Sequence, residues 1–223
     1  MQFIYHIDSS KDILIAKDEL YNYLFRVRRL KNDQIYSFRN LKDDFIYKYK
    51  LTSINKKEAT FYLVESYLSP NKSNSNLHLA WAICDLKTIE KTLPSLNELG
   101  LARLSFIYSD FSQKNFKINY DRVEKILINS SMQCGRSDMM IIEEFNSLEE
   151  FLGQYPNSHM LNFSNRYLNN SLDIKTLIVG SEGGFSHREI ELFEENKIIG
   201  LKNNLILRSE TATISAVAIL SSF

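Results

Sequence analysis

The sequence predicts a two-part α/β protein, a small β-barrel with one helix followed by a larger domain built on a mostly parallel sheet. Up to about Leu68 the chain consists of short segments rich in aromatic and β-branched residues, which are typical of strands. The polar stretch from Ser69 to Asn76 has no apolar periodicity and is typical of a linker. After it, strand-like and helix-like segments alternate, which favours a sheet covered by helices. We therefore expect two domains, residues 1–70 and 71–223.

The barrel is expected to contain four strands and a basic helix. The expected strands are FIYHI (3–7), DQIYSF (33–38), DFIYKYKL (44–51) and EATFYLVES (58–66). The segment from Lys17 to Leu30 has apolar residues at helical spacing and ends in a basic cluster of Arg26, Arg28 and Arg29. Arginines beside aromatic residues can contact phosphate and stack on a base. A solvated basic helix face would have the same pattern.

The charge distribution supports the same division of roles. The chain has no net charge overall, yet residues 1–72 carry 13 Lys and Arg against 9 Asp and Glu, and the remainder is acidic by the same amount. Phosphate contacts require an excess of basic residues. The N-terminal part is therefore the candidate nucleic-acid-binding part.

The second domain is expected to alternate six strands with five helices. The expected strands are 77–83, 102–108, 138–144, 159–163, 175–180 and 198–201, and the expected helices are 85–100, 119–134, 147–154, 186–197 and a closing helix. Cys84 and Cys134 lie far apart, and no histidine has the spacing of a zinc ligand. We expect a reduced, metal-free, cytoplasmic protein, because the sequence has neither a signal peptide nor an apolar run of about 18 residues.

A glycine-rich loop is the strongest candidate for a ligand site. An apolar run ending at Val179 is followed by GSEGG (180–184) and by the expected start of a helix near Ser186. Glycine lets the backbone approach a ligand closely, and ligands of open α/β sheets bind beyond the carboxyl ends of strands. A tight turn without a ligand would also use glycines. The loop matches neither the nucleoside triphosphate nor the dinucleotide motif, and Val179 stands where a nucleophile elbow has glycine.

The C-terminal segment is the second candidate. A short strand and a turn at 202–204 lead through Leu205–Leu207 to Arg208, Ser209, Glu210 and Thr211, before a helix rich in small residues. Ser209 or Thr211 can cap this helix. An ion pair between Arg208 and Glu210 at the helix start would explain those two charges without any ligand.

Together the two segments resemble the SPOUT superfamily of RNA methyltransferases, and within it the RsmE family, which methylates N3 of a uracil in small-subunit ribosomal RNA. The family pattern is an apolar strand, G-P-E-G-G-F, an acidic residue in the next helix, and I-L-R-[ST]-E-T-A. The matching residues are Gly180, Glu182, Gly183, Gly184, Phe185, Glu189 and the run Ile206–Ala212. Weaker matches are 25–36, 97–100 and Gln133 with Arg136. The chain departs from the pattern at Ser181, at 93–96 and at 108–110.

The resemblance implies a C-terminal trefoil knot, which is rare among folds, and an N-terminal PUA-like RNA-binding domain. It also implies a homodimer that completes the site, and 16S rRNA of the small ribosomal subunit as partner. It places S-adenosylmethionine (SAM) between three loops. The residues expected to bind SAM are Val179, Gly180, Glu182, Gly183, Gly184, Leu201, Leu205, Leu207 and Ala212.

The expected chemistry assigns roles to two charged residues. Transfer to a ring nitrogen requires alignment and a way to handle the N3 proton and the developing negative charge. Arg208 suits charge stabilisation, and Glu210 or Glu182 suits proton acceptance or orientation. Arg136 joins Arg26, Arg28 and Arg29 as a candidate RNA contact. The alternatives are a SPOUT enzyme acting on another RNA, such as a tRNA or rRNA ribose, and a non-catalytic RNA-binding or ribosome assembly protein of the same fold.

Overall fold

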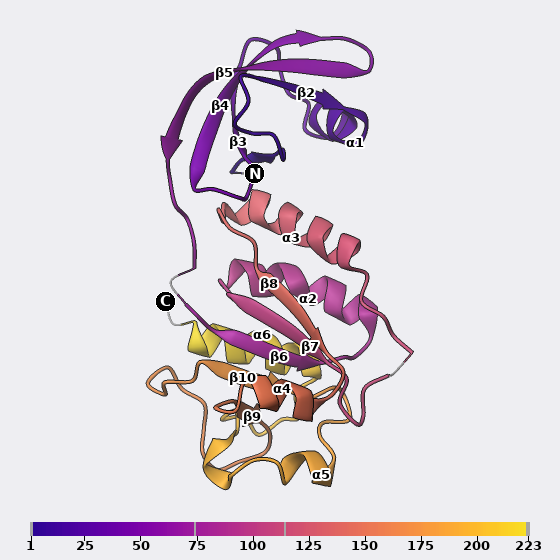
Figure 1. The fold of residues 1–223 in the computed structure, drawn as a ribbon, viewed down its shortest axis with the longest axis vertical. Coiled ribbons are helices and arrows are strands. Elements are labelled where there is room, and N and C mark those ends of the chain that lie inside the picture. Colours follow the sequence, from indigo (N-terminus) through magenta and orange to yellow (C-terminus); the bar gives the residue numbers. More distant parts are fainter. Residues whose placement is uncertain (1, 74, 114, 222–223) are drawn as a thin grey trace. The chain divides into compact units, whose positions relative to one another are not determined.

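The computed structural model describes residues 2–73, 75–113 and 115–221, which form two compact units (Figure 1). The first unit comprises residues 1–72 together with 131–139, and the second comprises 73–130 and 140–223. The domain boundary expected after residue 70 stays a prediction. Segment 131–139 belongs to the first unit although it lies about sixty residues further along the chain. In the described part of the chain, no helix is both long and apolar enough to span a membrane.

The first unit is built on a five-stranded sheet that curls into a half-barrel. Its strands are β1 (Ile4–Tyr5), β2 (Ile13–Lys17), β3 (Ile35–Arg39), β4 (Phe45–Ile54) and β5 (Glu58–Leu68), in the order β1-β3-β4-β5-β2. The β1–β3 pair is parallel, and the other pairs are antiparallel. Strand β2 was not expected from the sequence. The predicted barrel is open, since β1 and β2 are the two edges of the sheet order.

A short helical segment closes one side of this sheet. Helix α1 (Asp18–Asn22) continues directly into η1, a π-helix at Tyr23–Val27, within the segment expected to be helical. Leu24 is its buried residue. The core below contains an aromatic cluster, with the ring centroid of Phe38 5.2 Å from those of both Tyr49 and Phe61 in edge-on packing. Such geometry is favoured by the aromatic quadrupole.

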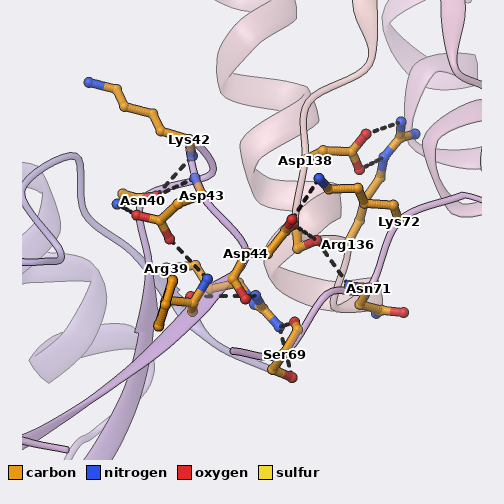
Figure 2. A network of polar contacts seen from close by, with 12 residues as sticks. Arg39, Asn40, Lys42, Asp43, Asp44, Ser69, Asn71, Lys72, Arg136 and Asp138 are labelled. Carbon is orange, nitrogen blue, oxygen red and sulfur yellow. Dashed lines mark hydrogen bonds and ion pairs between the residues drawn. The ribbon is translucent and has the colours of Figure 1, made fainter. Parts of the chain in front are cut away.

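Hydrogen bonds explain why segment 131–139 belongs to the first unit (Figure 2). The Ser137 hydroxyl accepts a hydrogen bond from the Asn71 amide N–H at 3.0 Å and donates one to the Asp44 carboxylate at 3.1 Å. The Asn71 side chain also donates to the Gly135 carbonyl at 2.9 Å. Lys72 lies 2.7 Å from Asp44, and its hydrogen bond lowers the pKa of that carboxyl group.

The second unit contains a six-stranded parallel sheet. Its strands are β6 (His78–Ala82), β7 (Arg103–Ile107), β8 (Ile141–Phe145), β9 (His159–Leu161), β10 (Thr176–Val179) and β11 (Ile198–Ile199), in the order β11-β9-β10-β6-β7-β8. All five pairings are parallel. The alternation predicted from the sequence is therefore confirmed for this sheet.

Helices cover both faces of the parallel sheet. They are α2 (Leu86–Glu98), α3 (Tyr120–Cys134), α4 (Leu148–Gln154), α5 (His187–Ile190), the 3-10 turn η2 (Glu195–Lys197) and α6 (Ser209–Leu220). Phe151 of α4 packs with Phe145 and Phe185 in a core over one face. Helix α6 packs on α2 and on β10, on the face from which Trp81 of β6 reaches Ser209.

The strand order creates a switch point between β6 and β10. From β6 the chain adds β7 and then β8 on one side. It then crosses to the other side of β6 to form β9, and β10 pairs between β9 and β6. Ligands of open α/β sheets bind beyond the carboxyl ends of strands at such a point. The residues there are Ile83–Asp85 after β6 and the glycine loop after β10. The trefoil knot implied by the family resemblance stays a prediction.

Candidate cofactor site

The glycine loop after β10 is a tight turn whose tip is open to solvent. The Gly184 N–H donates to the Ser181 carbonyl at 2.9 Å, and Gly184 has a left-handed φ of +71°. A Cβ at Gly180 would lie 3.0 Å from the Gly184 backbone, so both positions favour glycine. Glu182 and Gly183, at the tip, are exposed. The backbone at the tip is therefore accessible to a ligand.

The helix after the loop begins as the sequence predicted, but it is short. Ser186 caps α5 in a capping box, in which the Ser186 hydroxyl accepts from the Glu189 N–H and the Glu189 carboxylate accepts from the Ser186 N–H at 2.9 Å. The other oxygen of the buried Glu189 carboxylate accepts from the Asp110 N–H at 2.9 Å. Glu189 thus joins the start of α5 to the loop after β7. Helix α5 ends at Ile190, whereas the sequence predicted a helix to residue 197.

Ser209 connects the two sequence motifs. Its hydroxyl donates to the Gly180 carbonyl at 2.5 Å and accepts from the Trp81 indole N–H at 2.7 Å. The prediction that Ser209 or Thr211 caps α6 is wrong, because Arg208 is the N-cap residue and no side chain caps the helix. The Ser209 hydroxyl is instead used to hold the start of α6 against the end of β10.

Carboxylates gather at the carboxyl end of β6. Burial, together with the smaller effect of the negative charges of Glu182, Glu210 and Asp85, raises the pKa of the Cys84 thiol to about 12. These three carboxylates therefore lie within electrostatic reach of one buried thiol, although they come from three separate segments of the chain. Such a region attracts a positively charged ligand.

Arg208 projects from the start of α6 into solvent. Its side chain is 85% exposed and lies 4.0 Å from the Glu210 carboxylate, the limit of an ion pair. An exposed pair at this distance contributes little to stability. The Arg208–Glu210 ion pair that the sequence suggested is therefore weak, and it leaves the Arg208 guanidinium accessible to a ligand.

The remaining candidate cofactor residues lie in different environments. Val179 is buried at the end of β10, and Leu201, Leu207 and Ala212 are half-buried. Leu205 is 75% exposed, and the adjacent Ile206 is 84% exposed. The Ser209 hydrogen bond brings the 179–184 and 207–212 segments together, while Leu201 lies two residues after the edge strand β11. Whether these residues bind a cofactor stays a prediction.

The candidate RNA contacts fall into two environments within the first unit. Arg26, Arg28 and Arg29 are exposed around the end of η1. Arg28 donates to the Tyr23 hydroxyl at 2.9 Å, and its guanidinium lies 5.2 Å from the Tyr23 ring centroid. Arg136 is instead buried and donates to both Asp138 oxygens at 2.8 and 3.3 Å (Figure 2). An RNA contact by Arg136 stays a prediction.

The loop after β7 was not identified from the sequence. The Ser186 hydroxyl donates to the Asp110 carboxylate at 2.5 Å, and Arg188 donates to the other Asp110 oxygen at 2.7 Å. Phe111 lies against Gly183. The signal that could have found these residues is their position, because they follow the carboxyl end of a strand next to β6.

Comparison with known proteins identifies relatives over the whole chain. Residues 71–221 match the RNA methyltransferase domain family, and residues 16–63 match the RNA methyltransferase PUA domain family. Ribosomal RNA small subunit methyltransferase E of Helicobacter pylori is 40% identical over 223 residues, covering 98% of this chain and 99% of the relative. The Rickettsia conorii protein of the same name is 30% identical, with 92% and 88% covered.

Two solved structures have a similar fold. A putative methyltransferase from Legionella pneumophila, in complex with SAM, aligns with a TM-score of 0.83 at 23% identity, covering 99% of this chain and 96% of that one. Ribosomal RNA small subunit methyltransferase E from Neisseria gonorrhoeae, bound to S-adenosyl methionine, aligns with a TM-score of 0.80 at 20% identity, covering 98% and 95%. The two-unit architecture is therefore shared along nearly the full length.

Proposed function

Because this chain belongs to the ribosomal RNA small subunit methyltransferase E (RsmE) family, we propose that it methylates N3 of a specific uridine in 16S rRNA. Membership rests on 40% identity over nearly the entire length of a relative and on the two matching domain families. The protein is accordingly a SAM-dependent methyltransferase of small-subunit rRNA. The target nitrogen and the residues that act on it are the proposed part.

The residues of the second unit fit SAM. SAM supplies a methyl group on a positively charged sulfur, and Glu182, Glu210 and Asp85 give the switch point negative charge. The exposed tip at Glu182 and Gly183 leaves backbone groups available to the ligand. We propose that SAM is bound by Val179, Gly180, Glu182, Gly183, Gly184, Leu201, Leu205, Leu207 and Ala212.

The observation that carries this proposal is the hydrogen bond from Ser209 to the Gly180 carbonyl. The two motifs that resemble the family's cofactor segments are separated in sequence, and this bond brings them into one site. It also places Arg208 and Glu210, on either side of Ser209, beside the glycine loop. One hydrogen bond thus links the candidate cofactor loop to the segment that carries both charged candidates for catalysis.

The proposed chemistry is an in-line displacement. Transfer forms a bond between uracil N3 and the methyl carbon and breaks the bond from that carbon to sulfur, whose electron pair stays on sulfur. The N3 proton leaves to a base or to solvent. Arg208 is placed to stabilise negative charge that develops on the uracil ring, and Glu210 is placed to orient the base or accept the proton.

Two further features belong to the proposal. The exposed Arg26, Arg28 and Arg29 of the PUA domain would contact RNA phosphates. A homodimer would complete the site, and it is supported by the exposure of Leu205 and Ile206 within the candidate cofactor segment. Sedimentation of the purified protein at micromolar concentration tests the dimer directly.

Calorimetric titration with SAM tests the cofactor site. The wild-type protein is expected to bind SAM, and Gly183→Val is expected to abolish binding, because a Cβ at Gly183 would lie 3.1 Å from Phe111 and the valine would disturb the tip of the loop. Gly153→Ala is the matched control, because a Cβ at Gly153 meets no atom within 4 Å. Absence of binding by the wild-type protein, with and without small ribosomal subunits, would overturn the proposed site.

A further inference from the structure

Phe111 is an exposed aromatic residue at the carboxyl edge of the parallel sheet. It lies in the loop after β7, the strand next to β6, and 52% of its surface is exposed. Single exposed apolar side chains are common and need no explanation by themselves. The surroundings of Phe111 distinguish it from such residues.

The backbone around Phe111 is held by the glycine loop and by the helix that follows. The Ser181 hydroxyl donates to the Phe111 carbonyl at 3.4 Å. The preceding residue, Asp110, donates its N–H to Glu189 and accepts from the Ser186 hydroxyl. The ring is therefore presented from a fixed backbone.

The side chain of Phe111 also lies directly against the tip of the glycine loop. A Cβ at Gly183 would be 3.1 Å from the Phe111 Cβ and 3.3 Å from two ring carbons. One side of the phenyl ring thus meets the candidate cofactor loop, while half of the residue remains open to solvent. With SAM bound at this loop as proposed, an acceptor base approaches the loop, and hence Phe111, to receive the methyl group.

We propose that Phe111 stacks on the acceptor base and so fixes the plane of the uracil. This inference rests on the proposed function and adds a substrate-binding residue to it. Unpaired RNA bases are recognised by stacking on aromatic side chains, which leaves their edges free. Because in-line displacement depends on alignment, a ring that fixes the base plane leaves N3 exposed toward the methyl group. The substrate class is an unpaired pyrimidine in RNA.

The test compares Phe111→Leu with Phe111→Tyr. Leucine keeps an apolar side chain against Gly183 but cannot stack, whereas tyrosine keeps the ring. With small ribosomal subunits that lack the methyl group as substrate, Phe111→Leu is expected to lower kcat/KM about 10- to 100-fold, the range of one base–aromatic stack. The Kd for SAM should be unchanged in Phe111→Leu, and Phe111→Tyr should keep the wild-type kcat/KM.

Ile141→Ala provides the matched control. Ile141 is 48% exposed and begins β8, at the amino end of the same sheet. Its substitution is expected to leave kcat/KM unchanged. The proposal is overturned if Phe111→Leu retains wild-type kcat/KM, or if its SAM affinity falls as much as its kcat/KM, since the ring would then only support the loop. A wild-type protein that neither binds SAM nor methylates subunits would overturn the proposed function and the stacking role with it.

Discussion

The hydroxyl of Ser209 donates a hydrogen bond to the carbonyl of Gly180, and the same hydroxyl accepts one from Trp81. Three elements that are distant in sequence therefore meet at one buried oxygen. Strand β6 provides the indole, β10 leads into the carbonyl, and α6 provides the hydroxyl. The stability of the candidate site should depend on this atom more than on any surface interaction.

Ser209→Ala is expected to destabilise the protein and weaken SAM binding. The substitution leaves the buried Trp81 N–H and Gly180 carbonyl without this partner, which costs about 1 to 3 kcal/mol per unsatisfied group. Urea unfolding and calorimetry measure the two effects. Thr211→Ala is the control, because Thr211 is exposed two residues further along α6 and caps nothing, and its effect should be within about 0.5 kcal/mol. Equal effects of the two substitutions would contradict the role of Ser209.

Arg208→Ala is expected to separate transfer from cofactor binding. If the guanidinium stabilises charge on the uracil ring, kcat should fall about 10²- to 10³-fold, as when one donor to a developing anion is removed. SAM binding should persist, because the Arg208 side chain projects into solvent. Methylation of small subunits and calorimetry distinguish the two. Lys91→Ala, which removes an exposed charge from α2, should change neither. Loss of SAM binding by Arg208→Ala would assign the residue to the cofactor instead.

The sequence predicted the parallel sheet well because its strands are apolar and separated by clear helical segments. The predicted length of α5 was too great. Ile190 and Phe193 have helical spacing and both pack on the core beside α4, but a tight turn and not a continuing helix connects them. Strand β2 was missed because it is short and runs directly into α1.

Other features depend on tertiary interactions that no local pattern contains. The Ser137 hydroxyl reaches Asn71 across 66 residues, and this hydrogen bond helps to assign segment 131–139 to the first unit. The position of Phe111 against Gly183 follows from the strand order, which places the loops after β7 and β10 at one edge of the sheet. Motif matching found the glycine loop but not the residues packed around it.

His78 is expected to make stability depend on pH between about 4 and 6.5. Burial, with a smaller effect of the nearby Arg103 charge, lowers the pKa of His78 to about 4. The Ser105 hydroxyl donates its proton to Glu143. In the 2.7 Å hydrogen bond between His78 and Ser105, the donor is therefore Nε2 of the neutral His78 ring. Between these pH values the unfolded chain binds the extra proton, and stability is therefore lost as pH falls from 6.5 towards 4. Above pH 6.5 this contribution is constant.

Urea unfolding across this pH range measures the effect of His78. His78→Gln should reduce the loss of unfolding free energy between pH 6.5 and 4 by an amount on the order of 2 kcal/mol. Asn170→Gln is the control, because Asn170 is exposed and carries no titratable group, so its substitution should leave the slope unchanged. The comparison is made between variants because burial also lowers the pKa of His6 and His159. A slope unaffected by His78→Gln would contradict the prediction.

We expect Arg26, Arg28 and Arg29 of the PUA domain to strengthen RNA binding in a way that depends on salt concentration. Removing one arginine that neutralises a phosphate should reduce the slope of log K against log salt by about 0.7 to 0.9. Arg26→Ala with Arg29→Ala removes two exposed charges and leaves Arg28 on the Tyr23 ring. Lys56→Ala with Lys57→Ala is a control of equal charge, placed in the turn between β4 and β5 of the same unit. Filter binding of 16S rRNA over a series of salt concentrations should show the reduced slope for the arginine pair alone. If both pairs reduce the slope equally, the PUA domain attracts RNA through its overall charge and the arginine cluster is not a defined phosphate site.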